Sequence, residues 1–503
     1  MNHFRVRTIQ NELGGRVFVN YATDTACDAT PPSWDTQTSR CYPMWWSPPA
    51  PISPGFGVFY KYTVSSVVES DAWASAPDVT TTYTYGGTPA WHYQDIPSVI
   101  APKDAAFADK LTWSDWRGYA TVTVAHGKAR TWYWVYRGME GDRRASGGCN
   151  AYSAPQVNGG FDWPYDQGLV AQVKYLNASG VSRQAITYSY AGAVLNGDAA
   201  DANYCTSYDH VAYLMANTRV ASVTGEGLTL TSTIDRSYDS DGRLVTERTN
   251  NNVTGTAVPA YPASQVYNAC RTIEYATTAA TTPPVLLDVP ARIKTYQQTT
   301  AGQACNLTAP AGARSGQTDT YYDGNTTLTG LTLTKGNVTQ ADAYASASAK
   351  VTTKATYDGS LGRVATTTDA NSHVTKYDYS PLTGYPDSLT VTNALNQATV
   401  TSFDSRFNVA SSVTDAGGHV TSLRYDDLGR LACVWAPQNV SPVTDYPTCA
   451  GTAAPANRVL AYRNTGTSIP SVVTMTRLDD AATPSMATRY DYLTGFGKPR
   501  ETQ

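Results

Sequence analysis

Few residues of this chain have the type and spacing that catalysis requires. Its 503 residues contain no G-x-S-x-G, H-E-x-x-H, Walker or complete G-x-G-x-x-G motif. The six histidines are scattered, and two of them, His373 and His419, occupy the same position in two repeated segments. A shared repeat position favours a structural role at the start of a strand. We therefore predict no catalytic residue and a protein that is not an enzyme.

Metal and cofactor sites have equally little support. The segment Asp239-Ser-Asp241-Gly242 begins like a calcium loop, but the third acid and the distant glutamate of an EF-hand are missing. We interpret it as a hairpin turn, in which an aspartate caps backbone amides. The eight cysteines include no C-x-x-C pair, so their spacing predicts no metal site. We expect neither a metal nor a cofactor.

Two cysteine pairs leave a choice open. Cys27 with Cys41, and Cys433 with Cys449, each bracket a proline-containing loop, and the total of eight cysteines is even. Disulfide bonds would staple both loops in an exported protein. Buried free thiols are the alternative.

Composition argues against charged macromolecular partners. Only 16% of residues are charged, the net charge is −4 and the pI is about 5.9, so no basic surface attracts nucleic acid. No apolar run is long enough to cross a bilayer, and no signal peptide is visible in this chain. The 35 tyrosines suit strands with one apolar and one wet side, because the phenol reaches water while the ring packs.

A repeated pattern organises the second half of the chain. Segments 369–375, 393–399 and 415–421 share an Asx-Ala start and lead to aromatic-aspartate pairs with a period of roughly 20 to 26 residues. Alternate residues of Val420-Thr-Ser-Leu-Arg-Tyr425 point to opposite faces, which predicts a half-buried strand. Asp426 then begins a tight turn that ends near Gly429. Two reversals in each period predict a continuous antiparallel ribbon of β-hairpins.

The same Tyr-Asp turn recurs elsewhere, with degenerate copies at Tyr322-Asp323 and Tyr490-Asp491. Segment 342–350 is expected to form at most about two helical turns. The proline-containing stretches 29–54, 277–290 and 436–455 are expected to be loops inserted at the ribbon edges. The residues predicted to shape the repeat are Tyr238, Asp239, Gly242, Arg243, Tyr357, Asp358, Gly362, Arg363, Tyr377, Asp378, Phe403, Asp404, Tyr425, Asp426, Gly429 and Arg430.

Tyr-Asp-x-x-Gly-Arg-Leu, followed by a second turn and Val-Thr-x-x-Tyr-Asp, resembles the YD repeats of RHS (rearrangement hotspot) proteins. That family includes bacterial polymorphic toxins, wall-associated proteins, the B and C components of insecticidal toxin complexes, and teneurins. The resemblance is specific from about residue 226 onward. Upstream, segments 4–21, 113–119 and 136–142 are similar to the less regular N-terminal shell region of large RHS proteins. This divides one continuous body into an irregular β-strand region, 1–225, and a YD-repeat region, 226–503.

The resemblance implies an all-β fold, in which a long antiparallel hairpin ribbon forms part of a spiral, hollow β-shell. In toxin-bearing relatives the shell encloses a variable C-terminal effector. The implied function is that of a non-enzymatic shell segment, with the remainder of the polypeptide and its effector as partners. The closing core and the toxin domain have no counterpart in this sequence. We therefore expect a fragment of a longer protein that is secreted or displayed at the cell surface.

An adhesive protein that binds surface glycans is the alternative function. Tryptophans are dense in the first half of the chain, and exposed indole rings would stack on sugars, as in wall-associated relatives. Buried rings would instead fill a thicker core, which we favour because most large aromatic side chains are buried. These tryptophans are Trp45, Trp46, Trp113, Trp116, Trp132 and Trp134.

Overall fold

The computed structural model shows an all-β chain, which confirms the predicted fold class. The described residues form 31 strands and no helix, so none of them belongs to a helix long and apolar enough to span a membrane. The structure describes residues 5–22, 27, 33–73, 77–94, 110–140, 142, 144–146, 148, 162, 166–195, 210–225, 228–255, 268–276, 288–298, 314–328, 333–345, 349–359, 361–437, 449, 456–464, 468–479 and 485–503.

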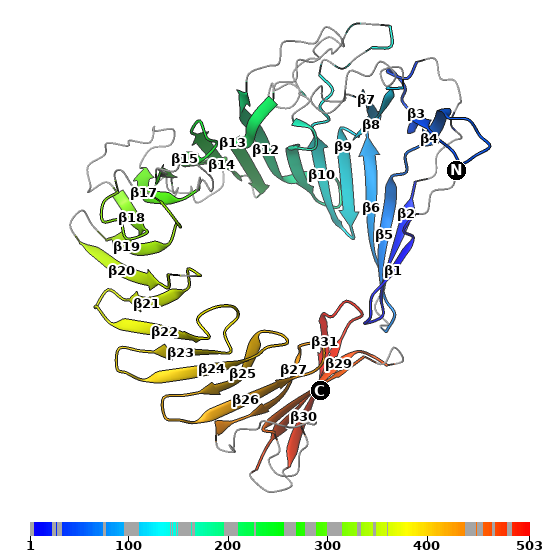
Figure 1. Ribbon diagram of the computed structural model, residues 1–503. Coiled ribbons are helices and arrows are strands. Elements are labelled where there is room, and N and C mark those ends of the chain that lie inside the picture. Colours follow the sequence, from blue (N-terminus) through cyan, green and yellow to red (C-terminus); the bar gives the residue numbers. More distant parts are fainter. Residues whose placement is uncertain are drawn as a thin grey trace.

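The strands follow one another along the whole chain (Figure 1). They are β1 (Thr8–Gln10), β2 (Gly15–Tyr21), β3 (Cys41–Trp46), β4 (Gly55–Tyr60), β5 (Val64–Asp71), β6 (Val79–Gly86), β7 (Ala90–Tyr93), β8 (Trp113–Gly118), β9 (Thr121–His126), β10 (Ala129–Val135), β11 (Val170–Leu176), β12 (Ser182–Leu195), β13 (His210–Gly225), β14 (Leu228–Tyr238), β15 (Leu244–Gly255), β16 (Asn268–Tyr275), β17 (Pro290–Gln298), β18 (Arg314–Tyr322), β19 (Val338–Tyr344), β20 (Lys350–Tyr357), β21 (Val364–Thr368), β22 (Val374–Ser380), β23 (Ser388–Thr392), β24 (Ala398–Asp404), β25 (Val409–Thr414), β26 (Val420–Tyr425), β27 (Leu431–Trp435), β28 (Arg458–Arg463), β29 (Ser471–Arg477), β30 (Met486–Leu493) and β31 (Pro499–Thr502).

One antiparallel sheet contains 27 of these strands. Each strand pairs with the next one along the chain, except that β2 pairs directly with β5 and β6 directly with β9. The excluded strands form two small hairpins, β3 with β4 and β7 with β8. Apart from these two steps, every neighbour in the ladder is the next strand along the chain, as in the hairpin ribbon that the repeat pattern predicted.

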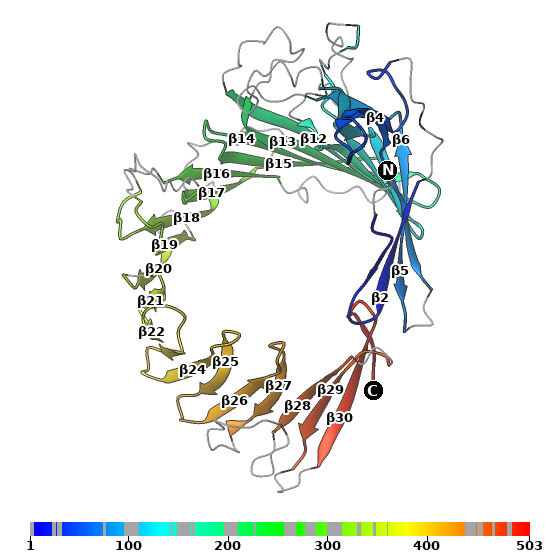
Figure 2. The ribbon, with the colours of Figure 1, turned by 45° about the vertical axis from the view of Figure 1, so that its right-hand side comes forward.

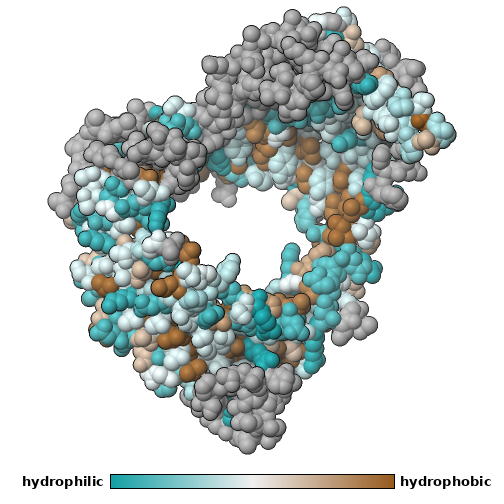
Figure 3. Space-filling view, viewed as in Figure 1, coloured by the Kyte–Doolittle hydropathy of each residue, from teal (hydrophilic) through white to brown (hydrophobic). Residues whose placement is uncertain are grey.

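The ribbon bends into a ring. Figures 1 and 2 show the tip of the last hairpin, β30–β31, returning to the turn between β1 and β2, and Figure 3 shows an open space through the centre. No ladder joins β1 to β31 among the described residues, so the sheet stays open and turns complete the ring. Pairing continues through β13 and β14, across the boundary predicted near residue 225. That boundary therefore stays a prediction.

The two small hairpins build an aromatic core at one edge of the ring. Trp91 of β7 stacks on Tyr42 of β3 with ring centroids 4.6 Å apart, and it meets Trp116 of β8 edge-on at 4.9 Å. Trp113 likewise packs against the buried Tyr93 at 4.8 Å. The tryptophans in this part of the first half are therefore held by other aromatic rings.

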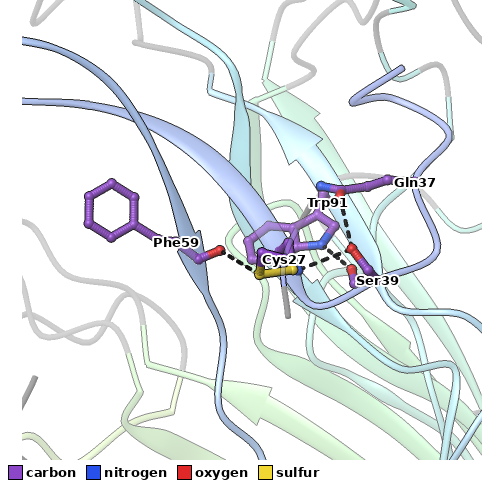
Figure 4. Close-up of a disulfide and its surroundings, with 6 residues drawn as sticks. Cys27, Gln37, Ser39, Phe59 and Trp91 are labelled. Carbon is purple, nitrogen blue, oxygen red and sulfur yellow. Dashed lines mark hydrogen bonds between the residues drawn. A yellow bond between two sulfur atoms is a disulfide. The ribbon is translucent and has the colours of Figure 1, made fainter. Parts of the chain in front are cut away.

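A disulfide bond between Cys27 and Cys41 fastens this core (Figure 4). Beside it, the indole N–H of Trp91 donates to the carbonyl of Ser39 at 3.1 Å. Cys433 and Cys449 form a second disulfide bond, next to the buried Trp435, and Cys270 is also disulfide-bonded. The disulfide alternative is therefore confirmed for both pairs that the sequence singled out.

One expectation about local structure was wrong. The stretch 29–54 is not only a loop, because β3 begins at Cys41 and pairs with β4. The described residues of segment 342–350 form no helical turn, within the expected limit of about two turns, since β19 runs to Tyr344 and β20 begins at Lys350. Cross-strand pairing of Asp342 with Thr352 stabilises these strands and overrides the helical composition. Most of the stretches 277–290 and 436–455 lies outside the described residues.

One five-residue turn makes most of the tight reversals. In turn 426–430, Oδ1 of Asp426 accepts the backbone N–H groups of Leu428 at 3.0 Å and Arg430 at 2.9 Å, while Gly429 has φ of 75°. In turn 415–419, Oδ1 of Asp415 likewise accepts the backbone N–H groups of Gly417 and His419, both at 2.9 Å. The Tyr-Asp turn and the Asx-Ala turn differ in sequence, but their geometry is the same. Turns 11–15, 177–181, 239–243, 369–373, 393–397, 415–419 and 426–430 share it.

Alanine at two turn glycines separates backbone strain from packing. Gly418 has φ of 83° and open space where a Cβ would lie, whereas a Cβ on Gly429 would lie 3.0 Å from the ring of Phe407. We expect Gly418→Ala to lower local stability by about 1 kcal/mol through positive φ alone, and Gly429→Ala to lower it by more. Hydrogen exchange of amides in β25 to β27 measures both losses. Equal losses of local stability in the two variants would contradict close packing of Phe407 against Gly429.

Candidate functional site

The repeat motif is a coupled unit of turn and neighbouring strand. In turn 426–430 the Arg430 guanidinium binds Oδ2 of Asp426 at 2.7 Å and lies 4.2 Å from the ring centre of Tyr462. The hydroxyl of Tyr462 in turn donates to the carbonyl of Leu431 at 3.0 Å. Turn 426–430 is therefore tied to the strand pair that follows it, through an ion pair, a cation–π contact and a hydrogen bond.

The same unit occurs earlier in the chain, at β14 to β16. Arg243 binds Asp239 at 2.8 Å and lies 4.8 Å from the ring centre of Tyr275, whose hydroxyl donates to the carbonyl of Leu244 at 3.0 Å. The motif Tyr-Asp-x-x-Gly-Arg-Leu thus has a physical explanation. Its Asp shapes the turn, its Gly takes positive φ, its Arg stacks on the next tyrosine, and its Leu supplies the carbonyl that this tyrosine binds.

Other predicted motif residues depart from this unit. The turn from Asp358 to Arg363 is one residue longer than turn 426–430. At the turn after β24, the Asp404 carboxylate instead forms an ion pair of 2.9 Å with Arg406, two residues along the chain. Tyr377 and Asp378 lie in the middle of β22, so the prediction of a turn there was wrong. The strand continues to Ser380 and ends before Pro381, which has no N–H for the ladder.

The degenerate copies also differ from each other. Tyr490 and Asp491 lie within β30, and the reversal follows at 494–498. Asp323 does lie at a turn, where its carboxylate accepts four backbone N–H groups from residues 334–337 at 2.7 to 3.0 Å. Burial opposes ionisation, but these amides bring the pKa of Asp323 down to about 2. The Asp323 carboxylate thus occupies a concave set of backbone N–H groups of the kind that binds anions.

Tyrosine hydroxyls connect strands along the whole ribbon. Tyr425, at the end of β26, donates to the carbonyl of Ala410 at the start of β25, at 2.9 Å. Burial, with Tyr188 and nearby charges, raises the pKa of Tyr190 to about 12, so its hydroxyl stays a donor over the physiological range. Eight tyrosines make this contact at 2.7 to 3.0 Å: Tyr21, Tyr85, Tyr190, Tyr275, Tyr322, Tyr357, Tyr425 and Tyr462.

A buried charged ladder crosses four strands of the sheet. Arg292 of β17 binds Asp319 of β18 through two hydrogen bonds of 2.7 and 2.9 Å. The strand register sets Asp319 directly opposite Asp342 of β19. Asp342 accepts from Lys350 at 2.6 Å and from Thr352 of β20 at 2.7 Å. The side chains of Asp319 and Asp342 are 1% and 0% exposed, so their cationic partners must neutralise them.

Hydrogen bonds in the ladder stabilise the charged forms of Arg292 and Asp342. Hydrogen bonding to Asp319 raises the pKa of Arg292. Burial opposes ionisation of Asp342, but hydrogen bonds from Lys350 and Thr352 outweigh burial and lower the pKa of its carboxyl. Two adjacent carboxylates are a pattern that some hydrolases use, yet here each one already binds a cation. The geometry therefore favours a structural role.

A second buried polar centre lies behind the β7–β8 hairpin. Nδ1 of His92 lies 2.9 Å from Oδ1 of Asp142, and both side chains are 3% exposed. Asp162 accepts the backbone N–H groups of Arg137 and Gly138 at 2.6 and 2.7 Å. A histidine–aspartate pair suits general base catalysis only where a substrate can reach it. Among the described residues no group of three metal-ligating side chains occurs.

The ring is completed at a seam between its two ends. The carbonyl of Gly495 accepts from the backbone N–H of Gly15 at 3.1 Å and from Nδ2 of Asn11 at 2.7 Å. The N–H of Gly495 donates to Asp71 at 3.0 Å, and Arg500 donates to the carbonyl of Trp73 at 3.0 Å. These contacts join turn 494–498 to the turns that follow β1 and β5. The sequence carries no local signal for this seam.

Loss of one tyrosine hydroxyl should weaken the sheet locally. Tyr425→Phe removes the bond to Ala410 and leaves a partly buried carbonyl without that donor, so we expect a loss of about 1 kcal/mol in local stability of β25 and β26. Tyr385→Phe is the control, since Tyr385 is exposed. Hydrogen exchange measures both. An unchanged exchange pattern in Tyr425→Phe would contradict the structural role of the hydroxyl.

The ladder makes stability depend on pH. Asp342→Asn should lower the free energy of unfolding by about 2 kcal/mol near neutral pH, because charged hydrogen bonds are lost. The folded pKa of Asp342 is depressed, so its contribution is complete above the unfolded pKa of about 3.8 and is lost as pH falls through the folded pKa. The gap between wild type and variant should therefore narrow in acid.

Urea denaturation at neutral and acid pH measures that gap. Asp378→Asn, at an exposed strand position, is the matched control and should change little. A gap for Asp342→Asn that stays constant down to acid pH would contradict the charged role of Asp342.

Comparison with known proteins gives a match in structure and none in sequence. No protein-family model and no curated protein matches the chain. The crystal structure of TcdB2-TccC3-Cdc42 matches with a TM-score of 0.64 and 12% identity over 97% of this chain. The Photorhabdus luminescens Tc holotoxin pore with the mutation TccC3-D651A matches with a TM-score of 0.65 and 12% identity over 98%.

The chain spans only 30% of the length of the chains that it matches in these structures. At 12% identity the likeness shows the fold alone. It covers both the regular repeats and the irregular first half, where sequence motifs were weak. The chain therefore has the RHS-repeat shell fold found in these toxin complexes, which confirms at the level of the fold what the YD motif implied.

Proposed function

We propose that this chain is a non-enzymatic wall segment of a secreted RHS-type shell that encloses a C-terminal effector and helps to deliver it. The observation that carries the proposal is a single 27-stranded sheet that bends around an open space and meets itself at a seam (Figure 3). Its likeness to toxin-complex structures over 97% of its length supports the same use.

An enclosing wall must resist opening, and three features of this one serve that need. The turns cap their own amides, eight tyrosine hydroxyls bind carbonyls of the preceding segment, and the disulfide bonds staple loops at Cys41 and Cys433. Disulfide bonds persist in oxidising surroundings, which supports export from the cell. The remainder of a longer polypeptide and its effector are the proposed partners.

The adhesive alternative has weaker support. Glycan binding by stacking needs an aromatic face open to solvent, but Trp45, Trp46 and Trp116 meet other aromatic rings at 4.9 to 5.8 Å. Lys174 covers Trp132 at 4.6 Å from the ring centre. No contact in the described part of the chain favours a sugar, so we retain the shell as the proposed function.

Limited proteolysis of the complete polypeptide that the reading frame encodes tests whether the shell protects an enclosed segment. We expect mass spectrometry after limited proteolysis to recover an intact segment from outside the shell sequence. Gly15→Val should remove this protection, because a Cβ on Gly15 would lie 2.5 Å from the carbonyl oxygen of Gly495 and so force the seam apart.

Gly55→Val is the matched control, since nothing lies within 4 Å of a Cβ at that strand position. It should leave protection unchanged. A reading frame without any further segment, or a segment cleaved equally fast in wild type and in Gly15→Val, would overturn the proposal.

A further inference from the structure

The ribbon has two edges that differ in chemistry. Because every strand is antiparallel to the next, successive turns alternate between the edges. We name the edge that carries turns 358–363, 381–387, 404–408, 426–430 and 494–498 the Tyr-Asp edge. The other edge carries turns 11–15, 369–373, 393–397 and 415–419, and we name it the Asx-Ala edge.

Exposed apolar side chains line the Tyr-Asp edge. Leu361, Leu382, Tyr385 and Leu428 are 51%, 65%, 82% and 74% exposed. We name these four residues the apolar stripe. Apolar side chains in a row on a protein surface mark interaction sites more often than single ones do.

The turns that carry the stripe lie side by side. Arg363 donates to the carbonyl of Gly384, which links the first turn to the second. The N–H of Phe403 donates to the carbonyl of Asp387 at 2.8 Å, and the ring of Phe407 packs against Gly429. The four apolar side chains therefore belong to one continuous edge.

The seam shows what a turn on this edge binds. Turn 494–498 is also on the Tyr-Asp edge, and its Phe496 occupies the third turn position, as Leu428 does in turn 426–430. At the seam this turn docks on turn 11–15 of the Asx-Ala edge, where Phe496 would lie 3.0 Å from a Cβ on Gly15. A Tyr-Asp edge thus already packs on an Asx-Ala edge within one chain.

We propose that the apolar stripe docks on the Asx-Ala edge of a second copy of this chain. The stripe continues the edge that forms the seam, and the Asx-Ala edge of the copy offers the same type of turn, with Leu395 exposed at the third position of turn 393–397. Different surfaces meet in such a contact, so it is heterologous and adds further copies head to tail. The proposal does not depend on an enclosed effector.

Sedimentation of the purified chain over a range of concentrations tests this contact. We expect the mass of wild type to rise with concentration beyond that of one chain. The double variant Leu428→Asp with Tyr385→Asp should raise the concentration at the association midpoint at least about tenfold, because charges replace apolar groups that the contact between copies would bury. Ile52→Asp is the matched control, as its side chain is also exposed, at 62%, but lies in the β3–β4 hairpin, across the ring from the stripe (Figure 1).

A mixing experiment identifies the second surface. Leu395→Asp should weaken self-association as the stripe variant does, and a mixture of the two variants should form dimers through the one intact pair of edges, without larger species. A wild type that stays monomeric, or a stripe variant that associates as strongly as Ile52→Asp, would overturn the proposal. So would a Leu395→Asp variant that associates like wild type, since the stripe would then pair with itself.

Discussion

The structure depends on one local interaction, in which a side-chain oxygen of the first turn residue accepts two backbone N–H groups across a five-residue reversal. At Asp426 these bonds measure 3.0 and 2.9 Å, and the same pair recurs at Asn11, near the other end of the sheet. Each turn then returns the chain antiparallel and in fixed register. Repeated at seven reversals, that step helps to build a sheet of 27 strands in which neighbours follow one another along the chain.

Contacts between neighbouring hairpins hold the successive turns and strands together as one continuous sheet. Arg430 links its turn to Tyr462, and the tyrosine hydroxyl returns to Leu431, so each hairpin helps to position the next. In strands β17 to β20, the ion pairs of Arg292 with Asp319 and of Lys350 with Asp342 also link neighbouring strands. Stability in such a ribbon is a sum of local units and nearest-neighbour contacts. The seam adds hydrogen bonds that join the two ends of the ribbon.

Sequence predicts the parts of this fold that are local. The turn at Asp426, the strand before it and the disulfide candidates all follow from short patterns. Local patterns say less where pairing partners decide, as at Asp342, which composition places in a weakly helical stretch but which Thr352 and Lys350 hold in a strand. They fail at Tyr377-Asp378, where Pro381 sets the end of the strand. The bond between Asn11 and Gly495 joins residues 484 positions apart, beyond any local signal.

Closure of the ribbon around an open centre can be tested by electron microscopy of the purified chain. Class averages should show a closed ring with an empty middle, in which the two ends of the ribbon meet at turn 494–498. Averages that show an open arc, with its ends apart, or a body filled at the centre would contradict ring closure.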